Sequence, residues 1–70
     1  MANTLDFKKI REIRRCLVAT TTKAKEASDR NDIEFAHYCS TEVRGMLTII
    51  AIIDTDKKIN TEFYEEQLPA

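Results

Sequence analysis

The sequence predicts an all-α fold, an antiparallel helical hairpin, and three observations lead to this prediction. Apolar residues recur at alternating spacings of three and four in two stretches, about 5–28 and 32–54. Between the two stretches, Ser28 to Asp32 are all polar residues suited to turns and helix caps. The 70 residues include one Gly and one Pro, which disfavours a fold of many strands and turns.

The first stretch has an apolar stripe flanked by lysines, arginines and glutamates. The members of the stripe are Ile10, Ile13, Leu17, Thr20, Ala24 and Ala27. Asn3 or Thr4 is the predicted N-cap, and Asp6 in the first turn complements the helix dipole. The pattern predicts an amphipathic helix.

The second stretch has a matching stripe. From Ile33 onward the same spacing returns, and the members of this stripe are Ala36, Cys39, Val43, Met46, Ile50 and Ile53. Folded back on the first helix, it places Ala36 opposite Ala27 near the turn and Ile53 opposite Ile10 at the open end. The β-branched run 47–53 resembles a strand, but the helical register continues through it and no partner strand is present. Agreement between two independent stripes favours the hairpin.

The C-terminal part of the chain is polar at first and then predicts a short helical turn. Asp54 ends the second helix, and Asn60 or Thr61 opens a turn that runs to about Leu68. Phe63, Tyr64 and Leu68 are expected to pack over the open end of the hairpin. Residues 1–70 are therefore predicted to form a single helical-hairpin domain.

A second stripe on the helix 32–54 predicts an oligomer interface. Its members are Phe35, Tyr38, Glu42, Gly45, Ile49 and Ile52. Gly45 lies at its centre, where glycine costs about 0.5–1 kcal/mol relative to alanine unless another helix approaches closely. Either the C-terminal segment covers Ile49 and Ile52, or the chain self-associates into a four-helix bundle or larger homo-oligomer; the pattern favours self-association.

Charge is divided unevenly along the chain. Residues 1–28 carry seven bases and three acids, a net +4, and residues 29–70 carry four bases and nine acids, a net −5. The densest basic segment supplies a candidate face for an anion or nucleic acid, made of Lys8, Arg11, Arg14 and Arg15. Neutralisation by Asp54 beside Lys9, and by the acidic C-terminal residues, explains the same division. With a pI of about 5.8 the sequence favours this neutralisation over general nucleic-acid binding.

The residues for catalysis or metal binding are largely missing from the sequence. A single glycine excludes a glycine-rich phosphate loop. Glu34, His37 and a cysteine could be imagined around a metal, but His37 and Cys39 diverge on a helix and zinc needs converging ligands. Cys16 and Cys39 are expected to be small core or boundary residues. The sequence therefore predicts no enzyme, no catalytic residue, no metal and no cofactor.

These observations favour a small non-enzymatic, oligomeric helical protein that acts as a regulator or inhibitor by binding a larger protein. One alternative is an RNA- or DNA-binding hairpin dimer that uses the basic segment. Another is an oligomer that sequesters a small anionic ligand such as a nucleotide between protomers, with donors from Lys8, Arg11, Arg15 and the run Thr20 to Thr22. The N-terminus lacks a signal-peptide pattern and the longest apolar run is too short to cross a bilayer, so a cytoplasmic location without membrane contact is expected.

Overall fold

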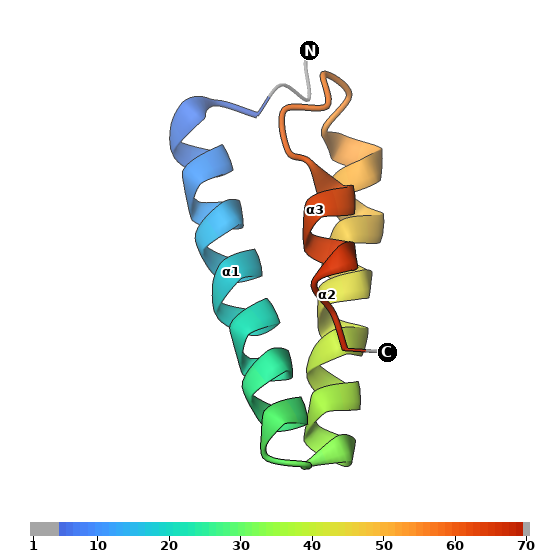
Figure 1. Cartoon of the computed structure of the whole chain (residues 1–70). Helices are drawn as coiled ribbons and strands as arrows, with labels where there is room; N and C mark the ends of the chain where they lie inside the picture. Colours follow the sequence, from blue (N-terminus) through green and yellow to red (C-terminus); the bar gives the residue numbers. More distant parts are fainter. Residues whose placement is uncertain (1–4, 70) are drawn as a thin grey trace.

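A computed structural model describes residues 5–69 as three helices (Figure 1). Helix α1 spans Phe7–Asp29, α2 spans Ile33–Ile53 and α3 spans Thr61–Glu66. The long helices α1 and α2 run antiparallel, and α3 turns back beside them toward the hairpin turn (Figure 1). The predicted all-helical hairpin with its C-terminal helical turn is confirmed, and the β-branched run 47–53 is helical.

Short polar side chains cap each helix at its N-terminus. The carboxylate of Asp6 accepts a hydrogen bond from the Lys9 N–H at 2.8 Å. Asp32 and Asn60 cap α2 and α3 in the same way, through the N–H groups of the residues three positions further on. The cap of α1 is thus Asp6, whereas Asn3 and Thr4, the predicted caps, lie outside the described residues.

The turn between α1 and α2 is tight because Asn31 adopts a left-handed conformation, with φ of 65°. Asparagine tolerates this region better than most residues with a side chain. The Asp32 N–H then donates to the Ala27 carbonyl at 2.8 Å, which closes the end of α1. The predicted polar turn therefore reverses the chain within three residues.

The core follows the predicted gradient from small to large residues. Near the turn the buried side chains are alanines: Ala24, Ala27 and Ala36. Toward the open end the core contains larger side chains: Ile10, Leu17, Val43, Leu47, Ile50, Ile59 and Tyr64. The last two of these come from the C-terminal segment, so the tail completes the core instead of lying over it.

Burial is shifted to one flank of the hairpin relative to the predicted stripes. Four residues assigned to the seam are only half-buried: Ile13, Thr20, Met46 and Ile53. Thr21, Ser40 and Leu47 are buried in their place. The cause is the C-terminal segment, which covers the flank that carries Leu47 and leaves the other flank open. Of the predicted tail residues, Tyr64 is buried and Leu68 is half-buried, but Phe63 is 53% exposed.

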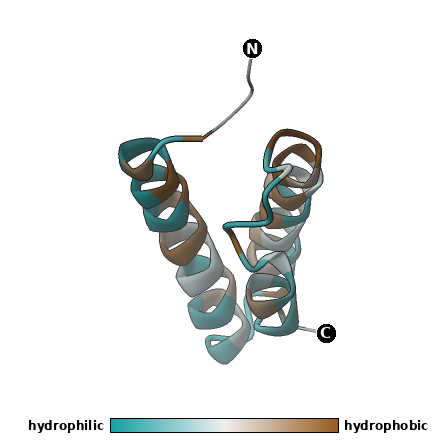
Figure 2. Ribbon diagram, turned by 90° about the horizontal axis from the view of Figure 1, so that it is seen from above, coloured by the Kyte–Doolittle hydropathy of each residue, from teal (hydrophilic) through white to brown (hydrophobic). Residues whose placement is uncertain are grey.

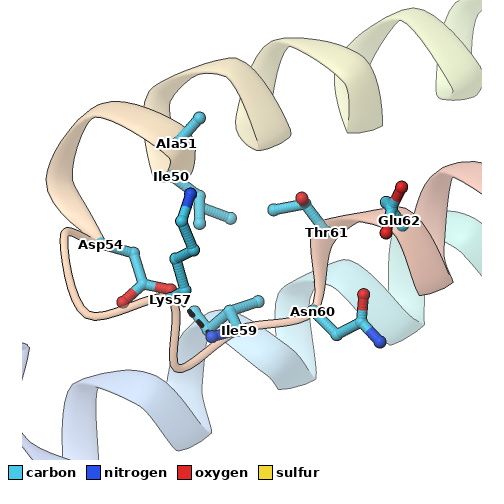
Figure 3. Close-up of a pocket in the computed structure, with 8 residues that line it drawn as sticks. All are labelled: Ile50, Ala51, Asp54, Lys57, Ile59, Asn60, Thr61 and Glu62. Atoms are coloured by element: carbon cyan, nitrogen blue, oxygen red, sulfur yellow. Dashed lines mark hydrogen bonds between the residues drawn. The ribbon is translucent and has the colours of Figure 1, made fainter.

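The loop between α2 and α3 is organised around the buried carboxylate of Asp54 (Figure 3). Its two oxygens accept hydrogen bonds from the N–H groups of Lys58 at 3.0 Å and Ile59 at 2.8 Å. Lys57, with φ of 52°, provides the change of direction that brings these N–H groups back. The predicted pairing of Asp54 with Lys9 is therefore wrong, because both carboxylate oxygens are engaged by the loop backbone.

Candidate functional site

One flank of the hairpin is an open apolar face. On it, α1 and α2 enclose a groove of about 300 Å³ whose lining is almost entirely apolar. The groove residues are Glu12, Ile13, Cys16, Met46, Ile49, Ile50 and Ile53. Seen along the helices, apolar residues surround the end of α2, whereas α1 is polar over most of its outer side (Figure 2). We use the term open face for this groove together with the predicted stripe on α2.

The predicted stripe on α2 is exposed along its whole length. Ile49 is 59% and Ile52 70% exposed, and Tyr38 is 59% exposed. The rings of Phe35 and Tyr38 stack with their centroids 6.3 Å apart, nearer the turn end of the helix. Glu42 and Gly45 between them are exposed as well. Because α3 lies on the opposite flank, the C-terminal segment does not cover Ile49 or Ile52.

Gly45 has open space where a side chain would be. A Cβ placed on it meets no atom within 4 Å, apart from those of its own helix turn and chain neighbours. Its backbone is ordinary α-helix and requires no glycine. After proline, glycine is the residue least favourable to a helix. No contact among the described residues explains its presence at position 45.

The predicted basic segment forms a face on the outside of α1. All four predicted residues are exposed: Lys8, Arg11, Arg14 and Arg15. The Arg11 guanidinium lies 5.3 Å from the centre of the Phe7 ring. Arg14 donates through Nη2 to the carbonyl oxygen of Lys58 at 2.9 Å, so the loop after α2 joins this face.

The predicted neutralisation of this face by acidic residues is not found. Within residues 5–69 the structure has two ion pairs, Arg30 with Asp32 at 4.0 Å and Lys58 with Asp56 at 3.9 Å. Both are local, exposed and long, and neither involves a base of α1. The acidic residues of α3 form no ion pair with the basic face in the described part of the chain.

The remaining candidate groups do not converge. Thr20 is half-buried, Thr21 buried and Thr22 exposed, so the three hydroxyls point in different directions. His37 is exposed and Cys39 buried, and both cysteines are free thiols. Residues 5–69 contain no group of three or more potential metal ligands.

The hollow beside the α2–α3 loop has both polar and apolar residues in its lining (Figure 3). Its lining includes Asp54, Lys57 and Glu62. The Asp54 carboxylate already accepts two backbone hydrogen bonds. A carboxylate engaged in this way is a structural group of the loop and not an available base.

Several residues of the two candidate faces were missed at the level of sequence. Ile13, Met46 and Ile53 were assigned to the seam, and the structure places them in the open groove. Phe7 and Lys58 were not assigned to the basic face at all. The spacing of Phe7, four residues before Arg11, was the one available signal for its stacking.

None of the helices in the described part of the chain combines the length and the apolar character needed to cross a membrane. No protein-family model, curated protein or solved structure matches the chain. The open face and the basic face are thus the two features from which a function can be argued.

Proposed function

We propose that this chain is a non-catalytic interaction module that assembles with a second copy of itself through the open face, as half of a four-helix bundle. The supporting observation is the difference between the two flanks of the hairpin. One flank is completed by Ile59 and Tyr64 of the C-terminal segment, whereas the other presents an apolar groove and four exposed large apolar residues. Regulation or inhibition of a larger protein stays a prediction from the sequence.

The exposed apolar side chains determine how large the free energy of association can be. Fully burying one large apolar side chain contributes about 1.5–3 kcal/mol. Two copies bring eight such side chains that are roughly half exposed, a contribution on the order of 6–12 kcal/mol. Association costs on the order of 4–15 kcal/mol in lost freedom. The two terms are comparable, so the loss of one central side chain should be enough to shift the assembly toward monomer.

The shape of the open face suits a second copy. The Phe35–Tyr38 pair lies toward the turn, and the groove lies toward the open end of the same face. A two-fold axis across the middle of the helices places the aromatic pair of one copy over the groove of the other. Gly45 lies seven residues from both Tyr38 and Ile52, close to such an axis, where the open space at its Cα lets two α2 helices approach closely.

Replacing Ile49 in the middle of this surface tests the proposal. We expect the unmodified chain to have twice its 8.1 kDa mass and Ile49→Lys to be monomeric, because a buried lysine without a partner weakens association at least about 100-fold. The measurement is light scattering during size-exclusion chromatography over a range of concentrations. Thr48→Lys is the matched control, since Thr48 is exposed on the side of α2 that faces α3 and should leave the dimer intact.

Circular dichroism of each variant would show that the helices are retained. A monomeric unmodified chain at high concentration would refute self-assembly. A dimer that persists in Ile49→Lys would refute assembly through the open face.

A further inference from the structure

We propose that the basic face of α1 binds single-stranded nucleic acid, with phosphates held by arginine and lysine side chains and a base stacked on Phe7. The face consists of Phe7, Lys8, Arg11, Arg14 and Arg15, together with Lys58 from the loop after α2. This site is separate from the open face, and its existence does not depend on self-assembly.

Basic residues predominate on this face, and the acidic residues beside it are Asp6, which caps α1, and Asp56, which pairs with Lys58. Between residues 7 and 25 the only acidic residue of α1 is Glu12, and Glu12 lines the groove on the open face. Lys8, Arg11 and Arg15 follow one another at spacings of three and four, so they share one side of the helix. Phe7 and Arg11 are also four residues apart, and their contact places the ring at the edge of the same charged surface.

Folding enlarges this surface with a residue that is distant in sequence. The Arg14 guanidinium binds the backbone carbonyl of Lys58, which fixes the loop against the outside of α1. The Lys58 ammonium lies 3.4 Å from the Leu5 carbonyl oxygen, beside the start of α1. Its pairing with Asp56 is exposed and 3.9 Å long, too weak to remove its charge from the surface.

The fold itself gains little from these residues. Lysines and arginines in the first turns of a helix oppose its dipole, and none of the α1 bases has an acidic partner among the described residues. Phe7 is 73% exposed and contributes little to the core. Five basic residues and one exposed aromatic at this end of α1 do not stabilise the fold. Binding of a ligand therefore explains their presence better than a contribution to folding stability does.

The aromatic ring favours a single strand over the other polyanions. Nucleotide bases stack on exposed aromatic rings and on arginine planes, and such stacking is largely independent of base sequence. In a duplex the faces of the bases are stacked on one another and are not accessible to the ring. An acidic protein surface has no bases that could stack on it. The phosphates would meet the lysines and arginines around the ring.

The overall acidity of the chain limits the affinity but leaves the site in place. Among the acidic residues of 29–70, Asp29 ends α1 at the turn, Asp56 pairs with Lys58, and the others lie on α2, on α3 or in the loops. A chain of net charge −1 does not attract polyanions at long range, so binding depends on local contacts. We expect modest affinity that falls steeply as salt is raised.

The test is fluorescence anisotropy with a labelled oligothymidylate, measured at two salt concentrations, about 50 mM and about 200 mM. Arg11→Glu with Arg15→Glu should abolish measurable binding, and Phe7→Ala should weaken binding about tenfold. Arg30→Glu with Arg44→Glu is the matched control, because it makes the same change in net charge at exposed positions away from this face. The control should bind several-fold more weakly at most.

Two further measurements separate this site from its alternatives. Duplex DNA and polyglutamate should bind more weakly than the single strand, and only the single strand should respond to Phe7→Ala. The monomeric Ile49→Lys variant should bind the oligothymidylate as the unmodified chain does, so a failure of assembly does not affect this result. Absence of binding at low salt, equal losses in the control variant, or polyglutamate binding of equal strength would overturn the proposal.

Discussion

Thr21 shows how a single residue in this small core can work against stability. Its side chain is buried, and its Oγ1 has no hydrogen-bond partner among the described residues. Thr41 and Thr48 on α2 differ from it: both are exposed, and their hydroxyls donate to the carbonyl oxygens four residues earlier at 2.9 Å. A buried hydroxyl without a partner costs about 1–3 kcal/mol.

We therefore expect Thr21→Val to stabilise the chain by about 1 kcal/mol, because valine fills nearly the same space without the hydroxyl. The free energy of unfolding from urea denaturation measures the change. Thr22→Val is the control on the exposed side of the same helix and should have little effect. A destabilised Thr21→Val would mean that the hydroxyl does have a partner, such as the carbonyl four residues earlier.

At the scale of the elements, the position of α3 depends on the loop that Asp54 holds. A helix of six residues is not stable alone, so α3 persists only where tertiary contacts fix it. Those contacts are the burial of Ile59 and Tyr64 and the two hydrogen bonds to the Asp54 carboxylate. The hydrogen bonds determine where Ile59 enters the core, and hence which flank of the hairpin α3 covers.

Asp54→Asn should lower the free energy of unfolding by about 2 kcal/mol, because the amide NH₂ group replaces one of the two acceptors that face backbone N–H groups. Amide hydrogen exchange across residues 61–66 should accelerate more than in the middle of α1. Asp56→Asn is the matched control, since Asp56 is exposed and makes only the long pair with Lys58. Equal effects of the two substitutions would show that Asp54 does not hold α3.

The same loop explains how far the sequence could predict the structure. The ends of α1 and α2 were predicted to within two residues, because periodicity and capping are local properties of the chain. The flank that α3 covers was not predicted, because it depends on the Asp54 loop and on Lys57 in a left-handed conformation. Ile13 and Met46 were assigned to the seam for that reason: a helical period gives the direction of a side chain but not the neighbour that covers it.

The prediction of the candidate faces has the same limit. The exposure of the whole second stripe on α2 and of the four arginines and lysines on α1 agrees with their assignment to surfaces. Lys58 could not be added to the basic face from sequence, because its carbonyl meets Arg14 across 44 positions. Such long-range contacts follow from tertiary packing and have no local signature.

At the scale of the whole molecule, charge gives the proposed dimer a specific arrangement. Glu12 and Lys23 are both exposed and lie 11 residues apart, close to three turns, so they occupy the same side of α1 as the groove. If the two α1 helices pack antiparallel about the two-fold axis, Glu12 of one copy meets Lys23 of the other, twice. In this arrangement each basic face, with Arg14 and the Lys58 loop, stays on the outside of the bundle and away from the interface.

A charge exchange tests this arrangement. Glu12→Lys or Lys23→Glu alone should weaken the dimer about 5- to 30-fold, because each substitution replaces two attractive pairs by repulsive ones. The double substitution Glu12→Lys with Lys23→Glu should restore the affinity, since it reverses both members of each pair. Sedimentation equilibrium measures the dissociation constants of the unmodified chain and of the three variants. A double variant whose dimer is as weak as that of either single variant would rule out this register. If the dimer were nevertheless still sensitive to Ile49→Lys, the open face would remain the interface, with the helices paired differently.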